Sequence, residues 1–398
     1  MSLTVPGLEA LELAGKRVLV RVDFNVPVDE AGAITDDTRI RAALPTIRAV
    51  LAAGGQPILL CHFGRPKGEV VERLRVDPMG VRLAELLGSP VMKLDESTGT
   101  GVARAIAAAP AGTTILLENV RFHPGETKAD ERLAREYAAL GDVFVNDAFG
   151  ASHRAHASVA GIAHSLPSAA GLLVRKELDA FARVLEDPEE PFVAVLGGAK
   201  VSDKLKVVDH LLERVTALVV GGGMAYTFLA SQGHTIGDSL FEESQVDLCR
   251  AALAKAATLG VELLLPVDHV VAERFVADAE AEACGVDIPA GRMALDIGPE
   301  TRTLFADRIR TARTVVWNGP MGVFELEQFR AGTEAVGRAL AECEGTTVVG
   351  GGDSVAALAL LGLTDRVTHV STGGGASLEL LEGKLLPGIA ALAPAPSA

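Results

Sequence analysis

Short apolar runs rich in β-branched residues alternate along most of the chain with longer stretches rich in Ala and Leu. In residues 1–170, strands are predicted at Arg17–Asp23, Pro57–Cys61, Thr113–Leu117 and Val143–Asn146, and helices at Arg39–Ala53, Val76–Leu87, Val102–Ala109 and Ala129–Leu140. Later strands are predicted at Phe192–Leu196, Ala217–Val220, Glu262–Leu265, Thr314–Trp317, Thr346–Val349 and His369–Val370. Alternation of this kind indicates parallel strands joined by crossover helices.

The alternation is interrupted near the middle of the chain. A charged helical stretch at Gly171–Leu185 ends at Glu186–Pro191, where acidic residues and prolines cluster. Such clusters end helices and mark exposed domain boundaries. A chain of 398 residues is long enough for two domains, since a domain has about 100–200 residues. The predicted fold class is α/β, with two Rossmann-like three-layer α/β/α domains that contain parallel sheets, at residues 1–170 and 188–384, joined by a hinge helix at 171–187.

Charge is distributed unevenly between these regions. Residues 1–170 contain 18 Lys and Arg against 20 Asp and Glu, the remainder contains 19 against 32, and the whole chain has a net charge of −15. Proteins that bind nucleic acid usually present a basic face, so this charge argues against such a partner. The nearly neutral first region can still concentrate its Arg side chains into a local anion site.

Neither a targeting segment nor a membrane span is predicted. Residues 1–10 lack the basic and then apolar pattern of a signal peptide. Val215–Ile236 contains no Asp, Glu, Lys or Arg, but its three consecutive glycines favour a buried strand, a loop and a helix. Free thiols in a reducing cytoplasm are expected, because no C-x-x-C pair or zinc spacing occurs among Cys61, Cys249, Cys284 and Cys343.

Polar and basic residues gather where the strands of the first half end. Asp23 and Asn25 are two positions apart, so an extended segment would point both to one side. The segments that follow contribute Arg39, His62, Arg65, Arg121 and Arg154. Ligands bind at the carboxyl ends of strands in open α/β sheets, and the planar fork of Arg matches phosphate and carboxylate. Any one Arg could be a solvated surface charge, but four at these positions predict an anion site.

Glycine-rich turns follow the strands of the second half, at Gly197-Gly198, Gly221–Gly223, Gly350–Gly352 and Gly373–Gly375. Successive glycines let backbone N–H groups approach a phosphate or a flat base, although a single such turn is often only a packing solution. Lys200 and Lys204 would share one face at the first turn of a helix, where the helix dipole disfavours cations. A bound polyphosphate would resolve that conflict, and the alternative is ordinary surface lysines.

Three polar residues of the second half have less specific signals. Asp353 could cap a helix or bind Mg²⁺ through a carboxylate oxygen, and the two roles are compatible. Asn318 and Glu325 end a strand and could bond ribose hydroxyls, but composition alone does not assign them.

These segments, taken in order, resemble the phosphoglycerate kinase family. The matching runs are R-V-D-F-N-V-P, H-F-G-R-P, E-N-V-R-F, H-R-A-H-A-S, L-G-G-A-K-V-S-D-K, G-G-G-M-A, W-N-G-P-M-G-V-F-E, G-G-G-D-S and S-T-G-G-G-A-S-L-E-L-L-E-G-K. The chain departs from the family pattern without losing a charged or ligating group, at Cys61, Phe63, Ser152, Ser354 and Thr372.

The resemblance implies a role for each matching position. Residues that would bind 3-phosphoglycerate are Asp23, Phe24, Asn25, Arg39, His62, Phe63, Gly64, Arg65, Arg121 and Arg154. Residues that would bind the nucleotide are Lys204, Gly222, Asn318, Glu325, Gly351, Gly352, Asp353 and Ser354, with Mg²⁺ at Asp353. Catalytic groups would be Arg39, Lys200, Gly373, Gly374 and Gly375. Residues 385–398 would pack back on the first domain.

The implied reaction is reversible, Mg²⁺-dependent phosphoryl transfer between ATP and the carboxylate of 3-phosphoglycerate, which yields ADP and 1,3-bisphosphoglycerate in glycolysis and gluconeogenesis. A carboxylate is ionised near neutral pH and needs no general base, so positioning and charge neutralisation do the work. Because the acyl phosphate is prone to hydrolysis, closure of the domains about the hinge helix is expected to exclude water. The family also implies a cytoplasmic monomer.

Two rival functions belong to other classes. A nicotinamide-dependent dehydrogenase shares the α/β pattern, but the chain lacks the G-x-G-x-x-G fingerprint with its later acid, as it lacks a P-loop. A nucleotide-sensing protein on the same scaffold would bind ATP without turnover. The four Arg residues of the first half argue against the second rival.

Overall fold

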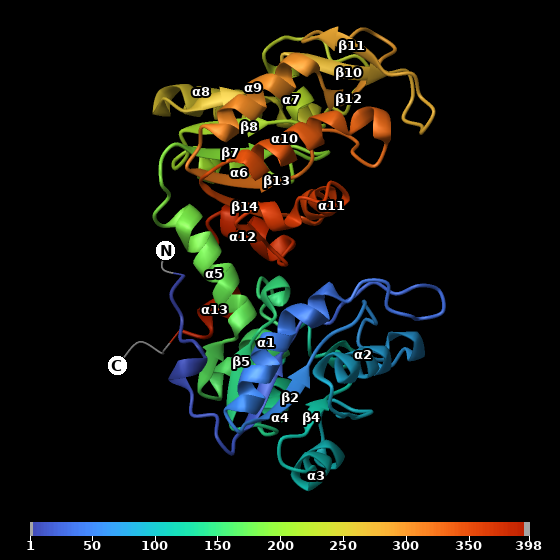
Figure 1. The fold of residues 1–398 in the computed structure, drawn as a ribbon, viewed down its shortest axis with the longest axis vertical. Helices are drawn as coiled ribbons and strands as arrows, with labels where there is room; N and C mark the ends of the chain where they lie inside the picture. The colour runs from blue at the N-terminus through green and yellow to red at the C-terminus, as the bar shows by residue number, and fades with distance from the viewer. Residues whose placement is uncertain (1–2, 394–398) are drawn as a thin grey trace. The chain divides into compact units, whose positions relative to one another are not determined.

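The computed structural model describes residues 3–393, so residues 1–2 and 394–398 lie outside the described part, as does most of the tail expected at Ala393–Ala398. The described chain divides into two compact units, which Figure 1 colours from blue to red along the sequence. The first unit contains residues 3–179 and 385–393, and the second unit contains residues 180–384.

The first unit is built on a six-stranded parallel sheet in the order β3-β4-β2-β1-β5-β6. Its strands are β1 (Arg17–Arg21), β2 (Gln56–Leu60), β3 (Val91–Lys93), β4 (Thr114–Leu116), β5 (Val143–Asn146) and β6 (Ser168–Ala170). The helices between them are α1 (Thr38–Ala52), α2 (Asp77–Leu87), α3 (Thr100–Ala108) and α4 (Glu131–Ala138). The carboxyl ends of β1, β2, β4 and β5 deliver the polar segments that the sequence analysis singled out.

The second unit contains a six-stranded parallel sheet in the order β15-β14-β13-β7-β8-β9 and a three-stranded antiparallel sheet in the order β11-β10-β12. The parallel strands are β7 (Phe192–Leu196), β8 (Ala217–Val220), β9 (Glu262–Leu264), β13 (Thr314–Asn318), β14 (Thr346–Gly350) and β15 (His369–Val370). The antiparallel strands are β10 (Asp268–Ala272), β11 (Glu282–Gly285) and β12 (Met293–Ile297). The helices are α6 (Leu205–Leu211), α7 (Met224–Ser231), α8 (Val246–Leu259), α9 (Pro299–Arg310), α10 (Ala331–Glu342), α11 (Gly352–Leu360) and α12 (Gly375–Leu381).

The prediction of an α/β fold with two parallel sheets is confirmed, and the antiparallel sheet was not foreseen. α5 (Leu172–Leu185) contains the boundary between the two units, which falls between Asp179 and Ala180. The last described helix, α13 (Pro387–Ala390), belongs to the first unit.

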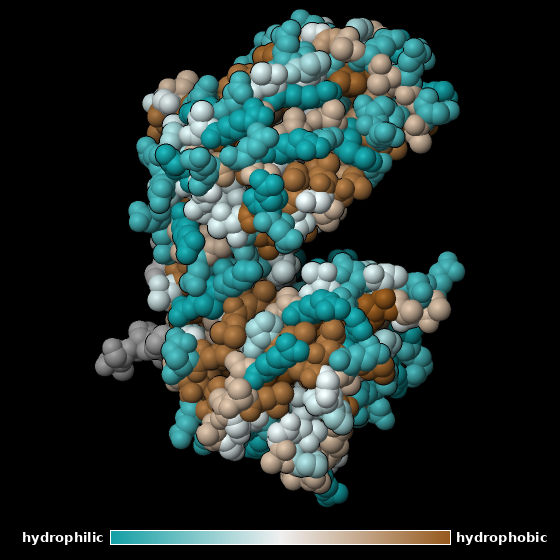
Figure 2. All heavy atoms as spheres, viewed as in Figure 1, coloured by the Kyte–Doolittle hydropathy of each residue, from teal (hydrophilic) through white to brown (hydrophobic). Residues whose placement is uncertain are grey.

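Buried aliphatic strands form the core of each unit. All five residues of β13 are buried, and Trp317 within it is fully buried against helix residues such as Phe305 and Leu340. Burial of each such side chain contributes ~1.5–3 kcal/mol relative to exposure. Hydrophilic residues cover most of the face of the second unit that Figure 2 shows. Among residues 3–393, no helix is both long enough and apolar enough to cross a membrane.

The end of the chain returns to the first unit. The Asn146 side chain donates from Nδ2 to the Gly388 carbonyl at 3.0 Å, and Gly388 N donates to the Ser152 carbonyl at 2.8 Å. A Cβ at position 388 would lie 2.6 Å from Val159 Cγ1, so glycine is needed for this approach. Ile389 is almost completely buried beside it. The final described residues therefore complete the core behind β5.

Candidate functional site

Arg39, Asp23 and Asn25 hold one another at the end of β1. Nη1 of Arg39, at the start of α1, lies 3.2 Å from Asp23 Oδ2 and donates to the Asn25 carbonyl at 3.0 Å. The Asn25 side chain accepts a hydrogen bond from Gly64 N at 2.9 Å, which ties this segment to the turn after β2. Arg39 keeps 40% of its side-chain surface exposed, so part of its guanidinium stays open to an anion.

Further basic residues surround this group. Arg121 donates from Nη1 to the Gly64 carbonyl at 2.8 Å, while its buried Nε has no acceptor within residues 3–393. Arg65 and Arg154 are exposed, and no oxygen in the described part of the chain accepts a hydrogen bond from their guanidinium groups. Several donors are therefore available to a bound anion.

Electrostatic effects show that these cations share one region. Burial lowers the pKa of His62 well below its usual range, and the charges of Arg21 and Arg121 lower it further. Burial and the same two arginines lower the pKa of His156 to about 4. Burial and the charges of Arg21 and Arg65 likewise lower the pKa of Arg121. A bound anion would relieve this repulsion.

Phe24 and Phe63, which the family pattern includes among substrate-binding residues, place their rings in the hydrophobic core. Side chains alternate along an extended segment, so Phe24 turns inward where Asp23 and Asn25 meet Arg39. The backbone N–H and carbonyl of Phe63 are both bonded to the Asn119 side chain. Neither ring is available to a ligand, because both are buried. The family pattern covers whole segments, so these two positions were included with their neighbours.

Asn119 has no role in the prediction from sequence, yet it organises two of the turns. Its Nδ2 donates to the carbonyls of Phe63 and Leu74 at 2.7 and 2.9 Å, and its Oδ1 accepts from the N–H groups of Phe63 and Arg121 at 3.2 and 3.1 Å. The side chain is fully buried and uses four of its hydrogen-bonding capacities. The one feature of the sequence that could have pointed to Asn119 is its position just after a predicted strand and two residues before Arg121.

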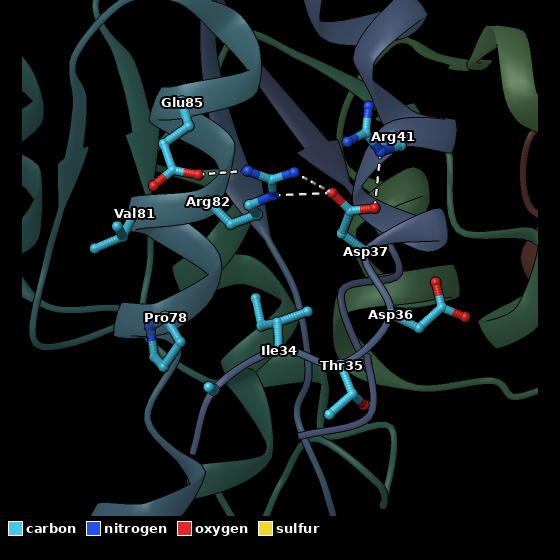
Figure 3. Close-up of a pocket in the computed structure, with 10 residues that line it drawn as sticks. Ile34, Thr35, Asp36, Asp37, Arg41, Pro78, Val81, Arg82 and Glu85 are labelled. Carbon is cyan, nitrogen blue, oxygen red and sulfur yellow. Dashed lines mark hydrogen bonds and ion pairs between the residues drawn. The ribbon is translucent and has the colours of Figure 1, made fainter. Parts of the chain in front are cut away.

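A hollow of about 710 Å³ lies between the start of α1 and α2 (Figure 3). Asp37 accepts hydrogen bonds from Arg41 Nε at 2.7 Å and Arg82 Nε at 2.8 Å, and these lower the pKa of its carboxyl. Arg82 also donates to Glu85. Both arginines of the hollow are thus paired, and they fix the N-terminus of α1, from which Arg39 projects.

In the second unit, backbone segments approach so closely that only glycine fits. Gly222 has φ +66°, and a Cβ there would lie 2.7 Å from Gly198 N and 2.8 Å from the Pro320 carbonyl. Gly319 has φ +100°, and a Cβ there would collide with the Gly197 carbonyl. The turns after β7, β8 and β13 therefore meet backbone to backbone.

Lys204 ties these turns together. Its Nζ donates to the Gly197 carbonyl at 2.7 Å and to the carbonyl and Oδ1 of Asn318 at 2.7 and 2.6 Å. Burial lowers the pKa of Lys204 to about 8, but three accepting oxygens match the three protons of an ammonium group, so the lysine is charged at neutral pH. The buried Nδ2 of Asn318 has no acceptor within residues 3–393, and it is an unused donor beside the turns.

The expectation that Lys200 and Lys204 share a helix face is wrong. α6 begins at Leu205, with Lys204 in the cap position, and Lys200 is an exposed residue of the preceding turn. Residues 202–204 form a turn where the sequence suggested a helix. Lys204 therefore contacts interior oxygens, whereas Lys200 is exposed.

A cavity of about 440 Å³ adjoins the glycine turns. Three of the predicted nucleotide-binding residues line it: Gly222, Glu325 and Asp353. Its apolar walls include Tyr226, Leu240, Phe275, Leu295 and Val323. Glycine backbone beside apolar side chains suits a flat aromatic base, and the carboxylates of Asp238, Glu325 and Asp353 can orient polar groups of a ligand.

Asp353 is the second residue of α11 and is exposed on the wall of the cavity. The expectation that it caps the helix is wrong, because Gly351 occupies the cap position and no side chain caps the helix. Within the described residues, no group of three or more His, Cys, Asp or Glu side chains is arranged to bind a metal. One carboxylate beside a phosphate-binding pocket fits Mg²⁺, which takes one or two carboxylates together with phosphate oxygens.

The remaining predicted residues of the second unit lie near these turns. Ser354 is fully buried, and its Oγ accepts a hydrogen bond from Gly319 N at 2.6 Å. A Cβ at Gly351 would lie 3.1 Å from Asn318 Nδ2. The glycines at 373–375 lead into α12, where Gly373 N donates to Ser371 Oγ at 3.1 Å.

The chain was compared with known proteins, and a sequence model described as phosphoglycerate kinase matches residues 8–384. A phosphoglycerate kinase of Moorella thermoacetica is 58% identical over 386 residues, which cover 97% of this chain and 98% of the relative. A phosphoglycerate kinase of Synechococcus elongatus is 53% identical over 394 residues, which cover 98% of both.

Solved structures agree with the sequence relatives. The phosphoglycerate kinase of Coxiella burnetii superposes with a TM-score of 0.90 at 42% identity, covering 98% of this chain and 99% of that one. The phosphoglycerate kinase of Pyrococcus horikoshii gives a TM-score of 0.83 at 32% identity, covering 97% and 98%.

Proposed function

The chain belongs to the phosphoglycerate kinase family and is a kinase of glycolysis, and on this premise we propose how its residues divide the work of phosphoryl transfer. The reaction moves a phosphoryl group between ATP and the carboxylate of 3-phosphoglycerate, giving ADP and 1,3-bisphosphoglycerate. The first unit binds the phosphoglycerate, and the second unit binds the nucleotide. The observation that carries this division is the cluster of guanidinium groups with unused donors at the strand ends of the first unit.

In the first unit, Arg65, Arg121 and Arg154 bind the phosphate of 3-phosphoglycerate, since their free donors suit a dianion. Arg39 lies beside Asp23 and Asn25 and keeps part of its guanidinium open, so it stabilises charge on the transferring group. His62 donates a hydrogen bond to the same substrate. Gly64 contributes through its backbone.

In the second unit, the cavity lined by Gly222, Glu325 and Asp353 holds the nucleotide. The unused Nδ2 of Asn318 gains an acceptor on the ligand. Lys200, exposed in the turn after β7, pairs with the transferring phosphoryl group, and the amides of Gly373–Gly375 assist it. Gly351, Gly352 and Ser354 complete the nucleotide site with Lys204, which also holds the turns together through the Gly197 and Asn318 oxygens.

Mg²⁺ accompanies the nucleotide, with Asp353 as its protein ligand. The metal supplies charge neutralisation for the phosphate oxygens. No general base is needed, because the attacking carboxylate is already ionised. The protein's own contribution is therefore positioning by Arg39 and Lys200, together with exclusion of water from a hydrolysable acyl phosphate.

We also propose that α5 acts as the hinge between the two domains and that the enzyme is a cytoplasmic monomer. The boundary between the compact units falls inside this helix, and all four cysteines are free thiols, as a reducing compartment would keep them. In small-angle scattering, the protein should have a smaller radius of gyration with both substrates bound than with either substrate alone. An unchanged radius would contradict the hinge.

The decisive experiment is an assay of ATP consumption with Mg²⁺, with and without 3-phosphoglycerate, coupled to reduction of the acyl phosphate. Turnover that requires 3-phosphoglycerate supports the proposal. ATP binding without such turnover would leave a nucleotide-binding protein and would overturn it. Calorimetry with NAD, for which no binding is expected, tests the dehydrogenase alternative.

A further inference from the structure

Arg21 is a fully buried arginine at the end of β1, behind the basic cluster. Its Nη2 lies 3.0 Å from His62 Nδ1, its Nη1 donates to the Val22 carbonyl at 2.6 Å, and its Nε donates to Ser158 Oγ at 2.9 Å. A guanidinium with no exposed surface cannot touch a substrate. Arg21 must therefore act through the groups that it contacts.

The contact with His62 fixes the chemistry of the imidazole ring. A guanidinium only donates hydrogen bonds, so His62 Nδ1 must accept with its lone pair. The neutral ring then carries its proton on Nε2. Nε2 has no partner in the described part of the chain and is not buried, so its N–H can be donated to a ligand.

A second buried pair holds Arg21 in place. Ser158 Oγ accepts from Arg21 and donates to Glu126 Oε1 at 2.6 Å, while Ser158 N donates to Glu126 Oε2 at 3.0 Å. Glu126 is fully buried, and its negative charge balances the guanidinium through the serine. Arg21 is thus anchored on one side and presents Nη2 to His62 on the other.

We propose that Arg21 is a positioning residue that locks His62 as the neutral Nε2–H tautomer, so that His62 donates a hydrogen bond to an oxygen of bound 3-phosphoglycerate. This deepens the proposed function and rests on the role given there to His62. The Arg21–Ser158–Glu126 arrangement replaces the carboxylate or carbonyl that usually orients a histidine. A carboxylate at Nδ1 would accept a hydrogen bond from Nδ1 and leave Nε2 as an acceptor. Arg21 at Nδ1 does the reverse and leaves Nε2 as the donor.

The first test is the ¹⁵N spectrum of the wild-type protein labelled at histidine, with His62 assigned by its loss in His62→Gln. Between about pH 6 and 8, where a free imidazole titrates, His62 should show a protonated Nε2 and an unprotonated Nδ1. A proton on Nδ1, or on both nitrogens, would overturn the proposal. This test requires no substituted arginine and no turnover.

The second test is kinetic. Arg21→Met should raise KM for 3-phosphoglycerate about tenfold, the effect of losing one hydrogen bond to a charged group, and leave KM for ATP within about twofold. Arg17→Met is the matched control, because Arg17 is on the same strand but pairs with Asp142 at the surface. The control should leave both constants unchanged.

The same substitution in a His62→Gln background separates positioning from general damage. The rise in KM should disappear there, because Arg21 acts through the imidazole. An equal rise in that background would overturn the proposal. If Arg21→Met fails to fold, Ser158→Ala keeps the arginine, loosens its anchor and should show a smaller rise with the same dependence on His62.

The outcomes also separate this proposal from the proposed function. If His62→Gln leaves KM for 3-phosphoglycerate unchanged while the coupled assay shows turnover, the substrate half of the inference is overturned and the kinase assignment stands. If the coupled assay shows no turnover, the nitrogen spectrum still decides whether Arg21 sets the tautomer.

Discussion

The two units approach anion binding by different physical means. The first unit gathers charged side chains, Arg39, Arg65, Arg121 and Arg154, and braces them with buried polar residues such as Asn119. The second unit relies on backbone, with glycine turns packed so tightly that no Cβ fits at Gly222. Guanidinium groups suit a small, highly charged acid. Backbone amides and apolar walls suit a larger ligand with a flat base and a phosphate chain.

Two asparagines at strand ends show how far each unit is prepared for its ligand. Asn119 in the first unit makes four hydrogen bonds to protein groups. Asn318 in the second unit accepts from Lys204 but leaves its buried Nδ2 without an acceptor in residues 3–393. Asn119 therefore holds its turns without a ligand, whereas Asn318 keeps a donor that a ligand can satisfy.

The largest expected effect tests the side-chain strategy. Arg39→Ala should lower kcat by about 10²–10³-fold, the usual loss when one donor that stabilises a transition state is removed. The affinity for ATP, measured by calorimetry, should be unchanged, because Arg39 lies in the other unit. Arg48→Ala is the control, because Arg48 is exposed on the same helix and, within residues 3–393, donates only to the Leu86 carbonyl. Near-normal turnover of Arg39→Ala would show that the guanidinium has no role in the chemistry.

The close packing of backbone in the second unit predicts a loss of stability when a single methyl group, with no change of charge, is added. Gly222→Ala should lower the free energy of unfolding of the second unit by ~2–4 kcal/mol, because the new Cβ meets backbone atoms and the residue has positive φ. Gly285→Ala, where nothing lies within 4 Å, is the matched control. Urea unfolding followed by the fluorescence of Trp317, the single tryptophan, measures both. Equal stability of the two variants would refute the close-packing argument.

Lys204 is a charged side chain that binds backbone oxygens, so it combines the means used by the two units. Its removal should have an effect smaller than that of Gly222→Ala. Lys204→Ala leaves the Gly197 carbonyl and two oxygens of Asn318 without their donor, which should cost ~1–3 kcal/mol of stability. The dissociation constant for ADP should rise about tenfold because the turns loosen. Lys206→Ala, at an exposed position of α6 two residues further along, should change neither quantity. Weaker ADP binding without any loss of stability would indicate direct contact with the ligand instead.

The smallest expected effect concerns pH. Burial raises the pKa of Asp296 in the second unit to about 7, so the folded state binds a proton that the unfolded state has lost between about pH 4 and 7. The free energy of unfolding should therefore fall as pH rises through this window. Asp296→Asn mimics the protonated acid and keeps an oxygen for Gly332 N. Above pH 7 it should be more stable than wild type by roughly 1–2 kcal/mol, and about equal below pH 4.

A control for this pH effect exists in the first unit. Burial also raises the pKa of Asp147 to about 7, but Asp147→Asn should leave the Trp317 transition unchanged, since the tryptophan reports on the second unit. A constant offset of Asp296→Asn at every pH would show that ionisation is not the cause.

Strands were predicted well where apolar runs were long and continuous. The bounds of β5, β7 and β8 were predicted without error, because a buried parallel strand needs an unbroken apolar run. β3 and β6 have three residues each, which is too few for an apolar run to mark them in the sequence. The antiparallel sheet was missed because β11 is largely exposed and its pairing with β10 is decided by tertiary contacts.

Within the candidate site, charged residues were easier to predict than the polar residues that support them. Arg39 and Asp353 gave a signal because charge at a strand end has a direct chemical meaning. Arg21, Glu126 and Ser158 are buried and hydrogen-bonded to one another, but in a sequence they read as ordinary polar residues. Burial is a property of the folded chain, so no local pattern reveals it.

The return of residues 385–393 to the first unit has a consequence for how the protein is made. Asn146 and Ser152 bind Gly388, yet residues 180–384 must be synthesised in between. At about 5–20 residues per second, that interval lasts roughly 10–40 s on the ribosome. The unit whose synthesis begins first is therefore completed only after residues 385–393 have followed the whole second unit out of the ribosome.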